Sequence, residues 1–360
     1  MSSFPAGSTQ EPGVRRPGLV ETGVAIKVAR RLASDPMEGS YLLQDLARSF
    51  GDLVAEAEPL VAEEAGFGPP TPARARVLSR SEWAEANISS TVKLLTPLLE
   101  KVEAKVPAVV EGSPGALARK AYGSFLGAQL GGVLGFVSQR VLGQYELDQA
   151  NAGDVWFVGP NVVITERRFG FVPRDFRLWV AVHELTHRAQ FEGNPWLRGY
   201  FHGSVGELLS SLELQPIPLL ERALKAVRAP ADGPDPIGIR LLDPHQREIF
   251  DRLQALMSTV EGHGNFVMDR VGAERIPTQP RMRRTLSGSS SMDGPLGKIL
   301  RRLLGLDLKK LQYEEGQRFF DAVFAAAGRA GVRAAFADAG SLPSLDELRD
   351  PDSWLARVRP

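Results

Sequence analysis

A chain of 360 residues with 43% apolar side chains is long enough to bury a large core, as soluble globular proteins do. Lysine plus arginine equals aspartate plus glutamate at 43 each, so net charge gives no sign of a nucleic-acid or membrane partner. The absence of cysteine excludes disulfides and thiolate metal sites, which fits a cytoplasmic protein and leaves His, Glu and Asp as ligands for any metal.

The N-terminal third of the chain is expected to be helical. Residues 1–18 have no apolar run long enough for a signal peptide and are expected to form a disordered leader. Apolar residues then recur with a helical period over 19–32, 41–65 and 81–105. We therefore expect residues 19–145 to form a helical part packed on the rest of the protein.

One segment of this part imitates a membrane span. Residues 121–139 carry no charge, and glycine recurs there at every fourth position, from Gly123 to Gly135. Such a stripe occurs in closely packed transmembrane helices, but the segment is at the short end of what crosses a bilayer and contains Gln129. We expect a buried helix that a second helix approaches closely, and no membrane span.

The strongest strand signals follow, at residues 154–158 and 162–165. Both runs are rich in β-branched and aromatic residues, and the turn-forming residues Gly159, Pro160 and Asn161 separate them. This pair could present an edge strand to a peptide. A mostly helical chain with one small sheet belongs to the mostly α, α+β class.

The segment His183-Glu-Leu-Thr-His187 spells H-E-x-x-H in a predicted helix. Positions i and i+4 share one helix face, so both imidazoles can reach a single metal ion. Glu184 would then lie beside the water that completes the coordination, where it can serve as general base for a zinc-activated water. The alternative is an amphipathic helix whose His and Glu side chains face solvent.

A catalytic zinc needs a third protein ligand, for which the sequence offers several candidates. His202 lies 15 residues after His187, farther than the metzincin pattern places its third histidine. Glu207 and His245 lie at helix starts, where the helix dipole or a capping role explains them. The segment 260–265, V-E-G-H-G-N, places Glu261 and His263 on a helix predicted over 244–268. A glycine within a helix is less favourable than alanine by about 1 kcal/mol, which indicates a specific role for this segment.

H-E-x-x-H followed far downstream by a helical E-G-x-x-N resembles the gluzincin arrangement of zinc peptidases. The resemblance implies a zincin-like fold, Glu261 as the third zinc ligand and Asn265 as the residue that orients a metal-bound histidine. Asn replaces the commoner Asp here, and the spacing of 74 residues from His187 to Glu261 is long for the compact type. His263 remains the rival third ligand.

Further strings resemble an actinobacterial family assigned as zinc-dependent metalloproteases and labelled as associated with coenzyme F420 biosynthesis. The similarity extends from about residue 19 to the end of the chain, and the substrates of that family are undefined. A peptide or protein substrate is what the resemblance to zinc peptidases implies. The strings include Gly143-Gln-Tyr-Glu146, Phe157-Val-Gly-Pro-Asn161, His187-Arg-Ala-Gln-Phe191, Pro195-Trp-Leu-Arg198 and Gln312-Tyr-Glu-Glu-Gly316.

The remaining expectations concern the C-terminal part. Residues 146–360 are expected to form the zincin-like catalytic part, with a basic, Ser/Gly-rich loop at 281–295 that is mobile. Tyr313 and His263 are candidates for the donor that stabilises an oxyanion. Nothing in the sequence indicates an oligomeric state.

Together these features predict a zinc-dependent hydrolase, most simply a peptidase. The alternative is a non-catalytic zinc-binding scaffold or partner-binding protein linked to F420 metabolism. Glu184 argues against that alternative, because a structural zinc site uses four protein ligands and has no need of a base.

Overall fold

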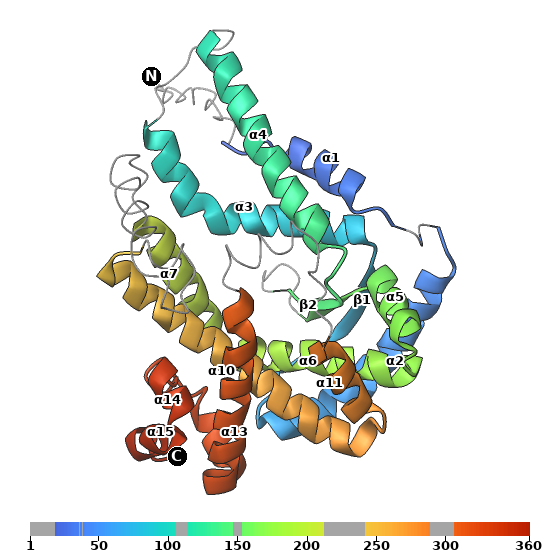
Figure 1. The fold of residues 1–360 in the computed structure, drawn as a ribbon, viewed down its shortest axis with the longest axis vertical. Coiled ribbons are helices and arrows are strands. Elements are labelled where there is room, and N and C mark those ends of the chain that lie inside the picture. Colours follow the sequence, from blue (N-terminus) through green and yellow to red (C-terminus); the bar gives the residue numbers. More distant parts are fainter. Residues whose placement is uncertain are drawn as a thin grey trace, which may run out of the picture.

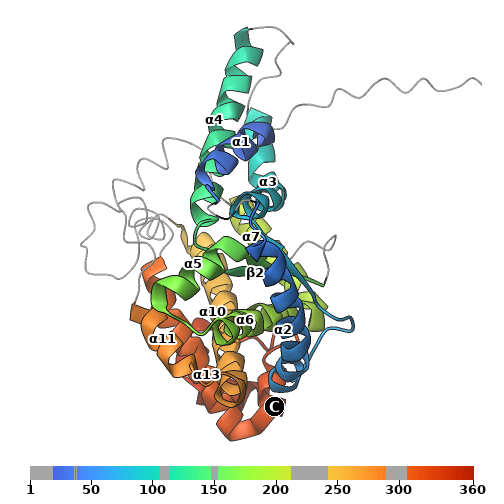
Figure 2. The same cartoon turned by 90° about the vertical axis from the view of Figure 1, so that its right-hand side faces the viewer.

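The computed structural model of the chain describes residues 19–35, 37, 39–105, 114–146, 153–211, 242–288 and 306–360. This part is mostly helical with one small sheet, which confirms the predicted class. The helices are α1 (Thr22–Leu32), α2 (Leu42–Ala65), α3 (Arg80–Lys105), α4 (Pro114–Val137), α5 (Gly159–Phe169), α6 (Pro173–Gly193), α7 (Pro195–Ser211), α10 (Pro244–Arg275), α11 (Gln279–Gly288), α13 (Leu306–Ala334), α14 (Leu345–Arg349) and α15 (Pro351–Val358). In Figures 1 and 2 the sheet lies between an upper group of helices, α1, α3 and α4, and a lower group that contains α6, α10 and α13.

The sheet has three strands in the order β1-β3-β2. They are β1 (Arg74–Leu78), β2 (Gly143–Tyr145) and β3 (Asp154–Val158). The central strand β3 runs parallel to β1 and antiparallel to β2. Strand β2 therefore forms one edge of the sheet.

All five residues of β3 are buried, because helices cover both faces of the sheet. Val155 and Phe157 belong to the larger hydrophobic core, where the Phe157 ring stacks on Phe50 of α2 with 3.9 Å between ring centroids. Trp156 and Val158 point the other way, into a smaller core shared with α1, α3 and α4. The strand thus joins the two groups of helices.

The larger core is built by α2, α6, α10 and α13. On α2, buried residues from Leu46 to Val61 recur with a helical period and face α6. The helix ends where Gly66 adopts a left-handed conformation, φ +80°, and its N–H donates to the Ala62 carbonyl. Helix α2 therefore shares a core with the segment 146–360, although it comes from the N-terminal part of the chain.

The glycine stripe of α4 lies against α1. A β-carbon at Gly127 would approach the Glu21 carbonyl oxygen to 2.4 Å, and one at Gly131 would approach the Ala25 carbonyl oxygen to 2.2 Å. The glycines thus permit the close helix packing that the sequence predicted. Within the residues described, no helix is both long and apolar enough to cross a bilayer.

Two sequence-based expectations for the sheet were wrong. Residues 162–165 are not a strand but lie in α5, because Pro160 at the first turn favours a helix start rather than a hairpin turn. β1 and β2 were not predicted, since β1 has exposed arginines at two of five positions and β2 has only three residues. The edge strands are therefore β1 and β2, and β3 is central.

The segment 281–295 also differs in part from the expected mobile loop. Residues 281–288 continue α11, while 289–295 lie outside the described residues, as does the leader 1–18. Helix α7 begins at Pro195, and residues 212–241 that follow it are not among those described.

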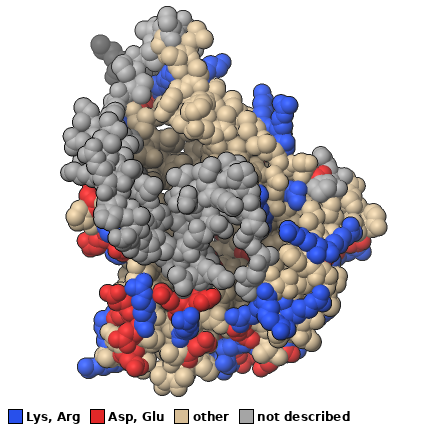
Figure 3. All heavy atoms as spheres, in the orientation of Figure 1, with Lys and Arg blue, Asp and Glu red and all other residues tan. Residues whose placement is uncertain are grey.

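Charged side chains of both signs are interspersed over the lower part of the face in Figure 3. Neither sign dominates that region, in keeping with the balanced composition.

Helices α10 and α13 cross where glycine faces glycine. A β-carbon at Gly316 of α13 would lie 2.2 Å from the Ser258 carbonyl oxygen, and one at Gly262 of α10 would lie 2.3 Å from the Gly316 carbonyl carbon. This contact explains why a glycine stands at position 262 within the segment V-E-G-H-G-N. The crossing holds the helix that carries Glu261 against α13.

We predict that Gly316→Ala lowers the free energy of unfolding by about 1–3 kcal/mol, because the new methyl group must push two backbones apart. Urea unfolding followed by circular dichroism measures this loss. The control is Gly51→Ala in α2, where nothing lies within 4 Å and alanine should stabilise the helix by up to about 1 kcal/mol. Equal effects of both substitutions would contradict the close crossing.

Candidate metal centre

Helix α6 carries the H-E-x-x-H motif through the centre of the larger core. It begins at Pro173, whose fixed φ suits a first helical position, and almost every residue from Leu178 to Phe191 is buried. Helix α2 packs on one side of it, and α10 packs on another. The motif side chains therefore face protein, not open solvent as the alternative interpretation of the motif required.

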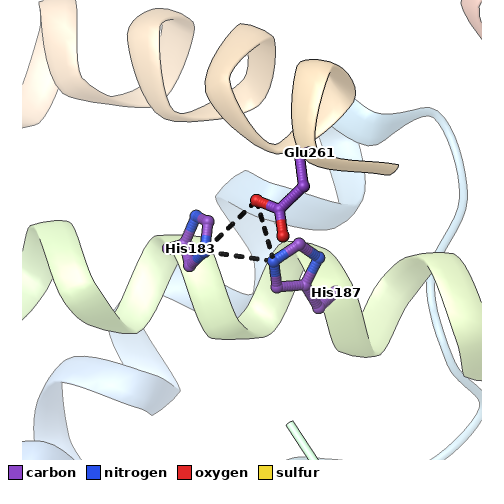
Figure 4. A group of neighbouring side chains, drawn as sticks. All are labelled: His183, His187 and Glu261. Atoms are coloured by element: carbon purple, nitrogen blue, oxygen red, sulfur yellow. Dashed lines mark hydrogen bonds and ion pairs between the residues drawn. The ribbon is translucent and has the colours of Figure 1, made fainter. Parts of the chain in front are cut away.

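Three potential ligand atoms meet between α6 and α10 (Figure 4). The Nε2 atoms of His183 and His187 are 3.1 Å apart. The carboxylate oxygen Oε2 of Glu261 lies 4.0 Å from His183 Nε2 and 3.9 Å from His187 Nε2. The structure thus brings together the two motif histidines and the glutamate that the sequence indicated as third ligand.

This donor set fits a zinc ion. Zinc–nitrogen distances of about 2.0–2.1 Å in a tetrahedral site place neighbouring ligand atoms about 3.3 Å apart. The two histidine nitrogens are 3.1 Å apart, and Glu261 Oε2 lies somewhat farther from them, at 3.9 and 4.0 Å. Two imidazoles and one carboxylate are also ligands that zinc prefers when cysteine is absent. The three side chains are 13% to 28% exposed, so the site is reachable from solvent.

The other ring nitrogen of each histidine has its own partner. Nδ1 of His183 lies 3.2 Å from Met268 Sδ, and Nδ1 of His187 lies 2.9 Å from Gln190 Oε1. Burial lowers the pKa of His183 to about 4, with a smaller contribution from His187 and an opposing one from Glu261. His183 is therefore neutral near pH 7, the protonation state that binds a metal.

Glu184 points from the same helix toward β2. The residue is 6% exposed, and a β-carbon at Gly143 would lie 2.7 Å from Glu184 Oε1. Burial raises the pKa of Glu184 to about 7; His187 opposes this, Glu261 adds to it, and a backbone hydrogen bond from Tyr145 opposes it. A buried carboxyl with a pKa near neutrality beside a possible metal site is suited to proton transfer.

His263 lies behind the metal centre instead of in it. It is fully buried and outside the group of ligand atoms, and its Nδ1 lies 2.9 Å from Gln190 Nε2. The ring centroids of Phe336, Phe320 and Phe67 surround it at 4.9, 5.0 and 5.6 Å. Burial is the main cause that lowers the pKa of His263 to about 3.

The other candidates are not gathered at the site. Glu207 accepts a hydrogen bond from Arg252 at 2.9 Å and lies 4.0 Å from His245, so these two candidates lie beside each other outside the ligand group. His202 lies on α7 and lines a separate cavity.

Two further residues were assigned roles around the ion by sequence. Asn265 lies on α10, but among the described residues it forms no hydrogen bond with His183 or His187, so its orienting role stays a prediction. Tyr313 lies in α13, and its side chain is outside the described part of the chain.

Sequence reasoning missed Gln190 and Arg188, which support the motif from within α6. Gln190 is three residues after His187 and hence on the same helix face, a signal that could have found it. Arg188 is fully buried, pairs with Glu58 of α2 and with Glu192, and donates to the Thr71 carbonyl at 2.5 Å. No local pattern indicates that this arginine is buried.

A cavity of about 640 Å³ lies beside β2, between α3 and α7. Gln144 and Tyr145 of β2 line it, together with Arg198 and Phe201 of α7. Arg198 donates a hydrogen bond of 2.7 Å to the Tyr145 hydroxyl. The cavity thus offers charged, polar and aromatic groups next to the strand that contacts Glu184.

Comparisons with known proteins agree with this geometry. The model of a family described as Zincin-like metallopeptidase matches residues 20–355. A crystal structure of a protein from Chloroflexus aurantiacus, described as a "putative hydrolase with a novel fold", is 34% identical in sequence and has a TM-score of 0.69. The match covers 94% of the present chain and 99% of the other. No curated protein matches the sequence significantly.

We predict that Glu261→Ala abolishes stoichiometric zinc binding, because it removes one of three ligand atoms. Metal content after dialysis, measured by mass spectrometry, tests this. The matched control is Glu207→Ala, which removes a carboxylate outside the ligand group and should leave zinc binding unchanged. Loss of zinc in His263→Ala but not in Glu261→Ala would reverse the assignment of the third ligand.

We predict that His263 makes the metal-free protein less stable in acid. Its pKa is about 3 when folded and about 6.5 when unfolded, so the unfolded chain binds the proton first as the pH falls. The stability associated with neutral His263 is present above pH 6.5 and is lost by about 1.4 kcal/mol per pH unit toward pH 3.

Urea unfolding in EDTA at pH 7.5 and pH 5.5 tests this pH dependence. The loss of stability between these pH values should be smaller in His263→Leu than in wild type by about 1 kcal/mol. Effects of other titrating groups cancel in this comparison. An equal loss in the two proteins would contradict the prediction.

Proposed function

The chain belongs to the zincin-like metallopeptidase family, and we propose that it is a zinc-dependent hydrolase that cleaves peptide bonds. The observation that carries the proposal is the convergence of His183, His187 and Glu261 beside the buried Glu184. A catalytic zinc keeps three protein ligands and one position for water, whereas a structural zinc is closed by four protein ligands. The donor set here is of the first kind.

The chain's own contribution to the reaction is proton transfer by Glu184. When bound, zinc would supply a Lewis acid that lowers the pKa of water and polarises a carbonyl. Glu184 accepts the proton of the attacking water and can return it to the leaving amine. Burial, which raises the pKa of its carboxyl to about 7 in the metal-free protein, makes it a stronger base than an exposed carboxylate. Its position between α6 and β2 holds the carboxylate in place for this transfer.

Strand β2 is the surface against which we place the substrate. Residues two apart on a strand present their backbone groups to the same edge, and the Tyr145 N–H at that edge bonds to Glu184. Gly143 is two residues before Tyr145 on β2, so its N–H and carbonyl face the same edge. A peptide added antiparallel to this edge would bring a backbone carbonyl close to Glu184.

The cavity beside β2 is suited to a substrate side chain. Its lining by Tyr145 and Phe201 gives apolar contact, and Arg198 provides a positive charge. In this arrangement the strand binds the peptide backbone and the cavity selects among side chains.

The sequence indicated His263 and Tyr313 as donors that could stabilise an oxyanion. His263 is buried among phenylalanine rings, which argues against that role. Tyr313 stays a prediction from sequence. An actinobacterial origin, a link to coenzyme F420 metabolism and a cytoplasmic location are likewise expectations from the sequence.

We predict that Glu184→Gln retains stoichiometric zinc and loses peptide hydrolysis by about 10²–10⁴-fold, because the amide cannot accept the proton. The measurement combines metal content with turnover of a library of quenched fluorescent peptides. Glu207→Gln is the control, since it changes an exposed carboxylate outside the site and should retain full activity.

Two outcomes would contradict the proposal. A wild-type protein that binds no stoichiometric zinc would exclude a zinc hydrolase. Zinc binding by wild type and Glu184→Gln without cleavage of any peptide by either would favour the non-catalytic zinc-binding scaffold.

A further inference from the structure

Gln190 connects the metal centre to a histidine that cannot reach the metal. Its Oε1 lies 2.9 Å from His187 Nδ1. Its Nε2 lies 2.8 Å from the Val260 carbonyl oxygen and 2.9 Å from His263 Nδ1. Gln190 and His263 are fully buried, so water does not compete for these hydrogen bonds.

The Val260 carbonyl fixes the direction of this chain of hydrogen bonds. A carbonyl oxygen only accepts, so the amide nitrogen of Gln190 must face Val260 and its oxygen must face His187. His187 therefore carries its proton on Nδ1 and donates it to Gln190. Its Nε2 is then an unprotonated acceptor that points toward His183 and Glu261.

The second N–H of the Gln190 amide needs an acceptor as well, and His263 Nδ1 provides it. His263 then carries its own proton on Nε2, for which no described residue supplies an acceptor. That N–H lies among the rings of Phe320 and Phe336, which compensate only weakly for a lost hydrogen bond. A buried donor without a partner destabilises the fold.

An apolar side chain at position 263 would avoid that unfavourable burial, since the surroundings are aromatic. What such a side chain would not do is accept from Gln190. The imidazole of His263 therefore serves to hold the Gln190 amide by accepting its N–H. The Gln190 amide in turn holds His187 by accepting from its Nδ1.

We propose that Gln190 is a positioning residue which selects the metal-binding tautomer of His187, and that His263 acts through it by holding the amide. We call the hydrogen-bonded series His187–Gln190–His263 the relay. The inference rests on the proposed function, because it takes His187 to be a ligand of the metal. The three residues come from two helices, so the relay also couples the position of α10 to the tautomer of a histidine on α6.

The first test is made on the metal-free protein by ¹⁵N nuclear magnetic resonance of the His187 ring. We expect wild type to show Nδ1 protonated and Nε2 unprotonated, and Gln190→Leu to show a mixture of tautomers. Because no metal takes part, this result is independent of whether the protein is a zinc hydrolase. A mixture in wild type, or no change in Gln190→Leu, would overturn the proposal.

The second test measures the dissociation constant of zinc by competition with a chromogenic chelator. Gln190→Leu should weaken zinc binding by about 10–100-fold, the usual effect of removing a hydrogen-bond partner of a ligand histidine. His263→Leu should weaken it in the same direction, and the double variant no more than Gln190→Leu alone, because both act through one amide. Independent, multiplicative effects would overturn the relay.

His263→Asn separates positioning from packing. Asparagine is smaller than histidine and leaves a cavity, whereas leucine fills the space. The side-chain oxygen of asparagine can nevertheless accept from Gln190 in place of His263 Nδ1. We expect His263→Asn to bind zinc more tightly than His263→Leu, even where urea unfolding shows it to be the less stable protein. Zinc affinity that follows stability instead would assign His263 a purely structural role. Absence of zinc binding in wild type would reject the proposed function and leave the tautomer result to decide the relay.

Discussion

A full positive charge lies inside the protein at Arg188, and the elements around α6 are arranged to pair it. Its guanidinium contacts Glu58 of α2 and Glu192, one turn further along α6. Glu58 also accepts from the Ala73 N–H at 2.9 Å, next to the start of β1. Removal of one partner from such a pair leaves an uncompensated charge, a loss of about 3–5 kcal/mol. The pairing therefore fixes the rotation of α6 against α2 and the sheet.

That rotation decides what each motif side chain faces. With Arg188 directed to α2, His183 and His187 face α10 and Glu184 faces β2. Helix α10 passes close to both imidazoles at Gly264, where a β-carbon would stand 3.7 Å from each ring, an ordinary van der Waals distance. The two histidine ligands and the base Glu184 thus lie on different sides of α6. Helix α10 packs against the side of the histidines, and β2 packs against the side of Glu184.

The sequence predicted the parts of this site that depend on one helix and missed those that depend on tertiary contacts. The i, i+4 spacing of His183 and His187 is a local pattern, and the glycines beside Glu261 indicated a helix under unusual constraint. The short strand β2 has no periodicity to recognise, yet it contacts Glu184. His263 drew attention as a rival ligand, but only the fold reveals that Gln190 stands between it and the metal centre.

The ligands His187 and Glu261 are 74 positions apart in the chain, and β1 pairs with β3 across 80 positions, from Arg74 to Asp154. Contacts between such distant segments form late, because the entropy of closing long loops opposes them. A growing chain that has been synthesised as far as α6 contains both histidines and the base but no complete donor set. It acquires one only after Glu261 has emerged and α13 has packed across Gly262. A cut within α7 therefore leaves two fragments, neither of which contains all three ligands.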